Sequence, residues 1–294
     1  MPIDSESLPG DKRFTIGKVA IYVCVIAMAL VYTLPFIVIV LTSLKDLDDI
    51  RTGSILSLPA RLTLEPWKLA WDSACISVQC EGLRPYFVNS VTMVIPALMV
   101  STFLGALNGY ALTLVRFRGA DFVFSVLLFG CFIPYQIVLI PMARVLGFAG
   151  LANSIPGLIL VHIVYGIPFT TLYFRNFFMS VPHELVQAAR MDGAGFFTVF
   201  TKILCPIAIS CFVVSVIWQF TNIWNDFLFG TTFASGANVP VMVALNNLVN
   251  ATTGVKAYNV DMAAVLITAA PTLLIYIVSG RYFLRGLMAG SVKG

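Results

Sequence analysis

Residues 19–44 read VAIYVCVIAMALVYTLPFIVIVLTSL, an apolar run without a charged side chain. A helix needs roughly 20 mostly apolar residues to cross a membrane, and this run exceeds that length. It is also longer than the apolar core of about 7–15 residues in a secretory signal peptide, and no small-x-small cleavage pattern ends it. We therefore expect the run to be a spanning helix that is retained.

The rest of the chain has the same apolar character. Of its 294 residues, 59% are hydrophobic and 11% are charged, whereas soluble domains are about 45–50% apolar and about 25% charged. This composition excludes an ordinary soluble globule, a disordered chain and a disulfide scaffold. Further apolar runs cover about residues 87–115, 122–142, 155–174, 206–230 and 261–280. The sequence thus predicts an all-α membrane protein with six transmembrane helices.

Lys and Arg are distributed unevenly between the two sides of the predicted bundle. With the N-terminus inside, 11 of the 18 Lys and Arg fall in inner segments and 7 in outer ones. Because positive charges concentrate in cytoplasmic loops, both termini are expected inside. The chain then divides into a cytoplasmic segment 1–17, a first helix with its periplasmic loop over 18–86, a core of five helices over 87–280 and a cytoplasmic tail 281–294.

The longest outer loop, about residues 45–86, contains Cys75 and Cys80. Disulfides persist in oxidising compartments such as the bacterial periplasm, which favours a bond between them. Two free thiols are the alternative, because four intervening residues do not fix the geometry of the pair. The sequence leaves both states open.

The motifs of several chemistries are absent. No G-x-x-x-x-G-K-[ST] phosphate loop occurs, so the chain lacks that means of binding ATP. The two histidines, His162 and His183, form no H-E-x-x-H pair, and no metal cluster or nucleophile elbow can be assembled. We expect neither an enzyme nor a metal site, and we interpret the net charge of +4 as a sign of membrane orientation, not of nucleic-acid binding.

Three polar residues are predicted at a similar depth, in the outer half of the membrane. At about 1.5 Å of helix rise per residue, Gln136 lies about 21 Å from the inner face, His162 about 10 Å below the outer face and Asn222 about 24 Å from the inner face. Their side chains donate and accept hydrogen bonds, as a path for a hydroxyl-bearing solute requires. Hydrogen bonding between helices is the alternative role. By the same count, Asp226 is expected at the outer membrane surface.

The segment 175–205 differs from the other connections because it is amphipathic and carries signals for the start and stop of a helix. Ser180 suits an N-cap, Pro182 a first turn and Gly193 a helix stop. Apolar residues at i, i+4, i+7 and i+8 are expected on the buried side of this helix, namely Val181, Leu185, Ala188 and Ala189. A pair of short helices lying on lipid headgroups is the alternative interpretation.

This segment resembles the EAA loop of ABC importer permeases. The resemblance rests on Pro182-x-Glu184-Leu185-x-x-Ala188-Ala189-x-x-Asp192-Gly193-Ala194, with Phe200-x-x-Ile203-x-x-Pro206 downstream. Together with the six apolar runs and the tail 281–294, the chain is similar over nearly its whole length to the maltose-type family of carbohydrate importer permeases. Gln187 departs from the pattern, because it stands where the family has the Glu that names the motif.

The resemblance implies a type I ABC importer permease fold and a division of labour among subunits. In such importers a second, homologous permease completes a heterodimer, two ATPase subunits bind ATP and Mg, and a periplasmic sugar-binding protein delivers the sugar. The residues implied in docking on the ATPase are Glu184, Gln187, Ala188, Ala189, Asp192, Gly193 and Ala194. The outer loop 231–260 is implied to reach into the binding protein and contains Gly236, Asn238, Asn246 and Asn247.

The expected function is that of a permease subunit, surrounded by lipid in the bacterial inner membrane, that moves a sugar inward without a cofactor of its own. Residues 224–230 and 245–250, with Cys75 and Cys80, are similar to the glucose/mannose branch. The alternatives are an importer permease for an oligosaccharide or glycerol phosphate, and a secondary carrier that works alone. Carriers coupled to protons bury ionisable relays in their spans, and this sequence offers no clear one.

Overall fold

The computed structural model of this chain describes residues 16–54, 56–115, 117–251 and 256–291. Within them every regular element is a helix, as the apolar runs predict, and the only β-structure is an isolated bridge between Ile76 and Gln79. Of the predicted terminal segments, residues 1–15 and 292–294 lie outside the described part of the chain. The predicted all-α fold class is therefore confirmed.

Four described helices are long and apolar enough to cross a membrane alone: α1 (Ile16–Ser43), α4 (Arg84–Tyr110), α7 (Ile155–Phe178) and α14 (Tyr258–Ser291). Two bent pairs supply the remaining runs. The first pair is α5 (Ala120–Phe132) with α6 (Tyr135–Phe148). The second joins α9 (Phe196–Val199), η2 (Phe200–Leu204) and α10 (Cys205–Ile207) to α11 (Ile209–Trp224). Six spans result when each bent pair counts as one.

The bent pairs depart from the straight helices assumed in the sequence analysis. α5 and α6 meet at 105°, and the helix 196–207 meets α11 at 80°. Pro134 explains the first bend, because it lacks an N–H and disfavours helical geometry in the residue before it. Ile133 accordingly has an extended ψ of 121°. The depth of about 21 Å assumed one straight helix over the run 122–142, so it does not apply to Gln136, which lies on α6.

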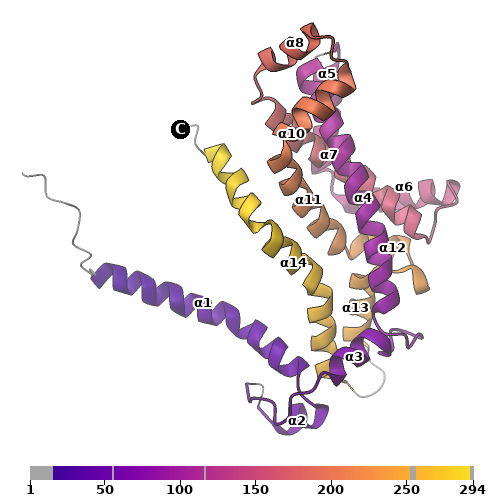
Figure 1. The fold of residues 1–294 in the computed structure, drawn as a ribbon. Coiled ribbons are helices and arrows are strands. Elements are labelled where there is room, and N and C mark those ends of the chain that lie inside the picture. The colour runs from indigo at the N-terminus through magenta and orange to yellow at the C-terminus, as the bar shows by residue number, and fades with distance from the viewer. Residues whose placement is uncertain (1–15, 55, 116, 252–255, 292–294) are drawn as a thin grey trace, which may run out of the picture.

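Shorter helices connect the spans. They are α2 (Leu47–Thr52) and α3 (Glu65–Asp72) in the first long loop, α8 (His183–Met191) between α7 and α9, and α12 (Leu228–Phe233), η3 (Gly236–Asn238) and α13 (Val241–Val249) before α14. Figure 1 shows α2 and α3 at one end of an elongated molecule and α8 at the other. The loops 45–86 and 175–205 thus lie at opposite ends, as the predicted topology requires. That the N-terminus faces the cytoplasm stays a prediction.

The disulfide between Cys75 and Cys80 closes a tight turn in the loop after α3. Ile76 and Gln79 exchange backbone hydrogen bonds of 2.7 and 3.1 Å inside it. The N–H of Leu83 donates to the carbonyl of Ala70 on α3 at 2.9 Å. The cross-link therefore fixes how the chain passes from α3 into α4.

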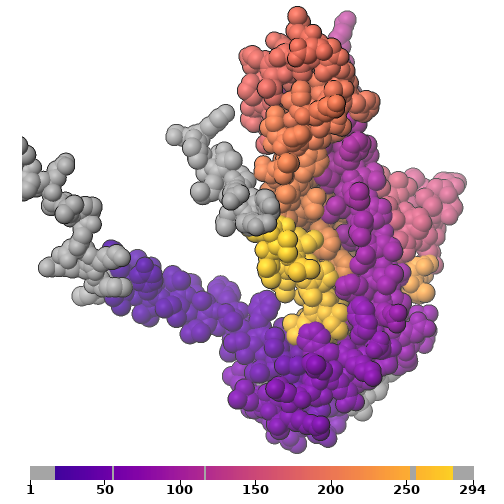
Figure 2. All heavy atoms as spheres, viewed as in Figure 1, coloured from indigo at the N-terminus to yellow at the C-terminus, as the bar shows by residue number. Residues whose placement is uncertain are grey.

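α1 stands apart from the rest of the molecule. Figures 1 and 2 show it projecting from the body, which it meets at the end near α2 and α14. None of its most apolar stretch is buried, yet its mean hydropathy is 2.7. At its outer end the amide of Asn259 donates to the carbonyl of Lys45 at 3.0 Å. A helix this apolar on every side requires lipid or another protein around it.

α4 and α7 make the closest contact between spans. Gly105 and Gly109 of α4 lie against α7, so that a Cβ on Gly105 would stand 2.1 Å from the Thr170 Oγ1. A Gly-x-x-x-Gly spacing is typical of helices whose backbones approach closely in a membrane. The Thr170 hydroxyl donates to the carbonyl of Ser101 at 2.9 Å. This pair forms the central unit on which the other helices pack.

Two apolar clusters flank a polar layer at the level of Ser101. The cluster nearer α3 and α13 surrounds Trp224, which is 1% exposed. The cluster nearer α8, the inner cluster, contains Tyr110 and Phe200. Between them the Gln219 amide on α11 donates to the Ser101 hydroxyl at 2.9 Å. Hydrogen bonds of this kind hold spans together where lipid supplies no hydrophobic driving force.

Gly105→Leu is expected to lower the melting temperature of the purified protein. The new side chain must displace Thr170 and the α7 backbone, and overpacking of this kind costs about 1–3 kcal/mol. Gly147→Leu on α6 is the matched control, because no atom lies within 4 Å of a Cβ placed there. Tryptophan fluorescence, recorded while the protein is heated in nanodiscs, measures the melting temperature of both variants. Equal melting temperatures for the two would contradict the close α4–α7 contact.

Candidate functional site

A cavity of about 660 Å³ lies beside the break between α5 and α6. Its walls come from α5, α6, α7 and α11 and from the segment that leads into α12. Of the residues predicted along a sugar path, His162 and Asn222 line this cavity. Gln136 does not, although its neighbour Tyr135 does; Gln136 itself is exposed on α6. The structure thus brings two of the three predicted residues together.

Aromatic rings form much of the cavity wall. Phe229 lies at the centre of one group, with its ring centroid 4.9 Å from that of Tyr165 and 6.0 Å from that of Tyr135. Phe169 stacks on Trp218 with an interplanar angle of 13°. Ligand sites commonly combine such apolar surfaces with a few placed polar groups.

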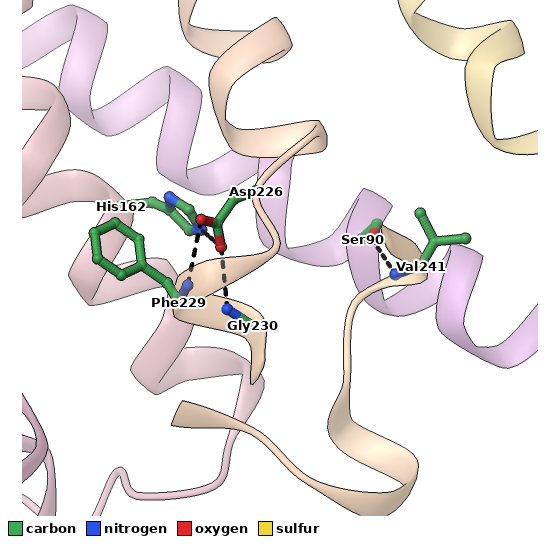
Figure 3. A network of polar contacts seen from close by, with 6 residues as sticks. All are labelled: Ser90, His162, Asp226, Phe229, Gly230 and Val241. Carbon is green, nitrogen blue, oxygen red and sulfur yellow. Dashed lines mark hydrogen bonds and ion pairs between the residues drawn. The ribbon is translucent and has the colours of Figure 1, made fainter. Parts of the chain in front are cut away.

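His162 and Asp226 both line the cavity, and Figure 3 shows their side chains next to each other. The His162 side chain is 6% exposed, and its Nε2 lies 3.7 Å from the Asp226 Oδ2, beyond hydrogen-bond distance. Nε2 has no hydrogen-bond partner. The Asp226 carboxylate accepts backbone N–H bonds from Phe229 at 3.3 Å and from Gly230 at 3.0 Å. The carboxylate is therefore held in place while one imidazole nitrogen beside it stays unpaired.

The structure adds to the sequence-based expectation for Asp226. Its side chain is only 14% exposed and packs beside His162. That Asp226 lies at the depth of the outer membrane surface stays a prediction. Asp226 lies past the end of α11, where burial raises the pKa of its carboxyl above the ordinary value and the backbone N–H bonds from Phe229 and Gly230 act in the opposite direction.

Three carboxamides line the same cavity: Gln219, Asn222 and Asn225. Asn222 donates one N–H to the Trp218 carbonyl at 2.8 Å, four residues earlier on its own helix. Asn225 does the same toward Thr221 at 2.8 Å. A carboxamide has two N–H donors and a carbonyl acceptor, so each can still bond a hydroxyl of a ligand.

Sequence reasoning missed most of this lining. The missed residues include Tyr135, Tyr165, Phe169, Gln219, Asn225 and Asp226. A signal was present, because Gln219, Asn222 and Asp226 recur at i, i+3 and i+7 and so share one face of a helix. His162, Tyr165 and Phe169 show the same spacing on α7. Reading side-chain faces in place of single polar residues would have identified both walls.

The amphipathic helix α8 lies at the opposite end of the molecule (Figure 1). It ends as the sequence predicts, because Gly193 adopts a left-handed φ of 83°. The Gly193 N–H donates to the Arg190 carbonyl at 3.0 Å, and the Ala194 N–H donates to the Ala189 carbonyl at 2.9 Å. This pair of bonds is the Schellman arrangement that closes a helix C-terminus.

The buried side of α8 differs from the predicted stripe. Val186 and Ala189 are buried in the inner cluster, at 2% and 9% exposure. Leu185 is 42% exposed, and Ala188 is also exposed. The predicted stripe was counted from Val181, which precedes the first helical turn and so does not share its phase. Ala189 therefore faces this chain's own core, which corrects its expected place on a docking surface.

The exposed side of α8 carries the remaining residues implied in coupling. Glu184 and Gln187 lie on it with Ala188, and Asp192 and Gly193 are exposed at its end. Ala194 is half-buried against the inner cluster. The helix thus presents one face outward while the other is fixed to the spans.

The inner cluster connects α8 to two spans. The Tyr110 ring of α4 lies 4.6 Å from that of Phe196 and 5.9 Å from that of Phe200. Each chain segment is π-helical here, over η1 (Ala111–Val115) after α4 and over η2 before α11. π-helical turns of this kind occur frequently at functional sites.

The segment 231–251 packs against α4 instead of forming an open loop. The Val241 N–H donates to the Ser90 hydroxyl at 2.8 Å (Figure 3). Asn238, expected at a partner surface, donates to the Asn153 carbonyl at 2.8 Å. Of the other residues implied there, Asn246 accepts a bond from Asn250 at 3.0 Å, while Gly236 and Asn247 are exposed.

Bent spans around a polar, aromatic-lined cavity, with an amphipathic helix at one end, are the features of a membrane transport subunit. Residues 86–284 match the family model of binding-protein-dependent transport system inner membrane components, and the chain belongs to this family. It is therefore a transport component and not an enzyme.

Individual relatives agree with this assignment. The chain is 46% identical to a probable ABC transporter permease of Pyrococcus horikoshii over 62% of its own length and 66% of that protein. It is 34% identical to XacI, a xylose/arabinose import permease protein of Haloferax volcanii, over 72% of its length and 75% of that protein. A chain of a bacterial ABC transporter that imports the acidic polysaccharide alginate shares the fold, with a TM-score of 0.79, 19% identity and coverage of 94% and 100% of the two chains.

Gly193→Ala is expected to loosen the C-terminal turn of α8, because a left-handed conformation costs an L-residue about 1–2 kcal/mol. Gly195→Ala is the matched control, since its φ is −74° and both glycines have open space around a Cβ. Hydrogen–deuterium exchange over residues 183–199 should rise for the first variant alone. Equal exchange in both variants would refute the role of Gly193 as the helix stop.

Proposed function

We propose that this chain is one of two permease subunits of an ABC importer that moves a saccharide across the cytoplasmic, or inner, membrane. The cavity between α5, α7 and α11 carries the proposal, because it combines aromatic faces with carboxamide, imidazole and carboxylate groups. Sugars present C–H faces that pack on rings and hydroxyls that pair with donors and acceptors. The names of XacI and of the alginate importer support a saccharide as the substrate class.

The finer proposal is a monosaccharide of the glucose/mannose type. It is supported by the sequence similarity at Cys75 and Cys80 and at residues 224–230. The latter segment supplies Asn225, Asp226 and Phe229 to the cavity. An oligosaccharide or a glycerol phosphate is the alternative substrate that transport assays must test.

The proposed partners supply the second half of the pathway, the hydrolysis of ATP and the delivery of the sugar. A second, homologous permease completes the pathway, and two ATPase subunits bind ATP and Mg²⁺. A periplasmic binding protein delivers the sugar to the end formed by α3 and α13. The family description as binding-protein-dependent supports this assembly, and the bare apolar surface of α1 is suited to packing against lipid and a partner permease.

Coupling is proposed to run from the exposed face of α8 to the cavity. Leu185 and Met191, 42% and 88% exposed, offer apolar contacts to an ATPase cleft, and Ala188 between them lets that surface approach closely. Movement of α8 passes through Val186 and Ala189 into the inner cluster. From there it reaches α4 and α11, and α11 carries Gln219 and Asn222 on the cavity wall.

The function is tested in vesicles that contain the chain with its partner permease, the ATPase and the binding protein. Glucose uptake should require ATP, and Asn222→Leu should lower it about tenfold, because two lost hydrogen bonds are worth about 0.5–1.5 kcal/mol each. Ser125→Leu, at an exposed position of α5 outside the cavity, is the control and should transport normally. Uptake by this chain alone would instead establish a secondary carrier.

Ala188→Trp is expected to prevent capture of the ATPase while all spans still insert. Ala188 is exposed on α8, so a large side chain there meets the partner and not this chain's own core. Co-purification of the ATPase with the tagged permease measures docking, and Ser125→Trp on α5 is the control. Normal capture by the Ala188 variant would exclude this face as the docking surface.

A further inference from the structure

The charged groups in the cavity lining indicate which saccharides the cavity can bind, neutral or acidic. This inference rests on the proposed function. All residues that line the cavity belong to the described part of the chain, and among them Asp226 is the only Asp, Glu, Lys or Arg. The other polar side-chain groups are the uncharged carboxamides, two phenols, a thiol, the Trp218 indole N–H and the His162 imidazole. This chain's side of the cavity therefore offers one carboxylate and no Lys or Arg to balance it.

The carboxylate is fixed where a ligand meets it. The backbone N–H groups of Phe229 and Gly230 hold its two oxygens at the start of α12. The Asp226 side chain retains 14% exposure, on the side that faces the cavity. These hydrogen bonds orient the carboxylate and favour its charged form, and they leave its charge uncompensated by any cationic side chain in the lining.

His162 adds a second requirement for a ligand. Its Nε2 is buried and has no hydrogen-bond partner, a state that costs free energy until a partner arrives. A hydroxyl oxygen about 2.8 Å from both Nε2 and the Asp226 Oδ2 is compatible with their separation of 3.7 Å, once a small side-chain shift exposes Nε2, whose accessible surface is under 1 Å². That hydroxyl donates its proton to the carboxylate and accepts the N–H of the imidazole. An ionised carboxylate has no proton to donate and is repelled by Asp226.

We propose that Asp226 and His162 form a hydroxyl-selective subsite that admits neutral saccharides and excludes sugar acids. The likeness to an importer of an acidic polysaccharide does not oppose this, because at 19% identity it concerns the fold alone. The side chains of the lining, and not the shared helix arrangement, set the charge that the cavity accepts.

Trp218 provides a local reporter for the test, because it lines the cavity and is 37% exposed. The assembled transporter in nanodiscs, without binding protein, is titrated with glucose or glucuronate while tryptophan fluorescence is recorded. A Trp218→Phe complex supplies the background from the other tryptophans. Glucose is expected to change the Trp218 signal, and glucuronate to need at least about tenfold more ligand for the same change.

Asp226→Asn should bring the two sugars within about threefold of each other, because it removes the charge while it keeps one oxygen for one of the two backbone N–H bonds. Asn222→Asp, at an exposed position of the same wall, should widen the difference. It tests the idea even where the Asp226 variant fails to fold. Asp121→Asn, outside the cavity at the start of α5, is the matched control and should change neither titration.

Glucuronate acting at the same concentration as glucose would overturn the proposal, as would a Trp218 signal that responds to neither sugar. An unchanged ratio of the two sugars in both charge variants would overturn it as well. Failure of ATP-dependent uptake of every saccharide tested would instead refute the proposed function. The two failures are distinguishable, because the fluorescence titration needs neither ATP nor the binding protein.

Discussion

The close approach of α4 and α7 is the constraint on which the rest of the structure depends. Lipid is as apolar as the side chains of a span, so close packing and hydrogen bonds between helices must hold the spans together. Gly105 brings the backbones near enough for Thr170 to bond the Ser101 carbonyl. The Ser101 hydroxyl at the same level receives the Gln219 amide. One glycine contact thus fixes three spans, and it sets the distance between the α7 and α11 walls of the cavity.

The break between α5 and α6 follows from a second constraint, the need to satisfy backbone groups away from water. Irregular backbone at membrane depth is tolerated where protein buries it or where it lines a cavity. Ile133 at the break lines the cavity, beside Cys131 and Tyr135. The bend therefore creates the space that the polar residues of α7 and α11 face. If the third span were straight, a helix would pack against α7 and α11, and the space between them would not form.

The sequence predicted those features that depend on local chemistry. Apolar length located the spans, and Gly193 marked the end of α8 because only a local left-handed turn was needed. Features set by tertiary packing were predicted poorly. Hydropathy reports the surrounding solvent and carries no information about a bend of 105°, so a depth counted along one straight helix does not apply to Gln136. Likewise the burial of Asp226 beside His162, where backbone N–H groups hold its carboxylate, depends on packing that no composition reveals.

The 80° bend before α11 joins a short helical segment near α8 to a longer helix that reaches the cavity. The short arm, residues 196–207, packs with α8 in the inner cluster, while α11 extends about 24 Å to the cavity at about 1.5 Å per residue. Packed cores move between discrete arrangements because they are too dense to deform continuously. Under the proposed coupling, a rotation of the short arm moves the far end of α11, where Asn222 and Asn225 line the cavity. The Tyr110 and Phe200 rings stack at 5.9 Å, so the same proposal includes α4 and predicts that displacement of α8 changes the separation of the cavity walls.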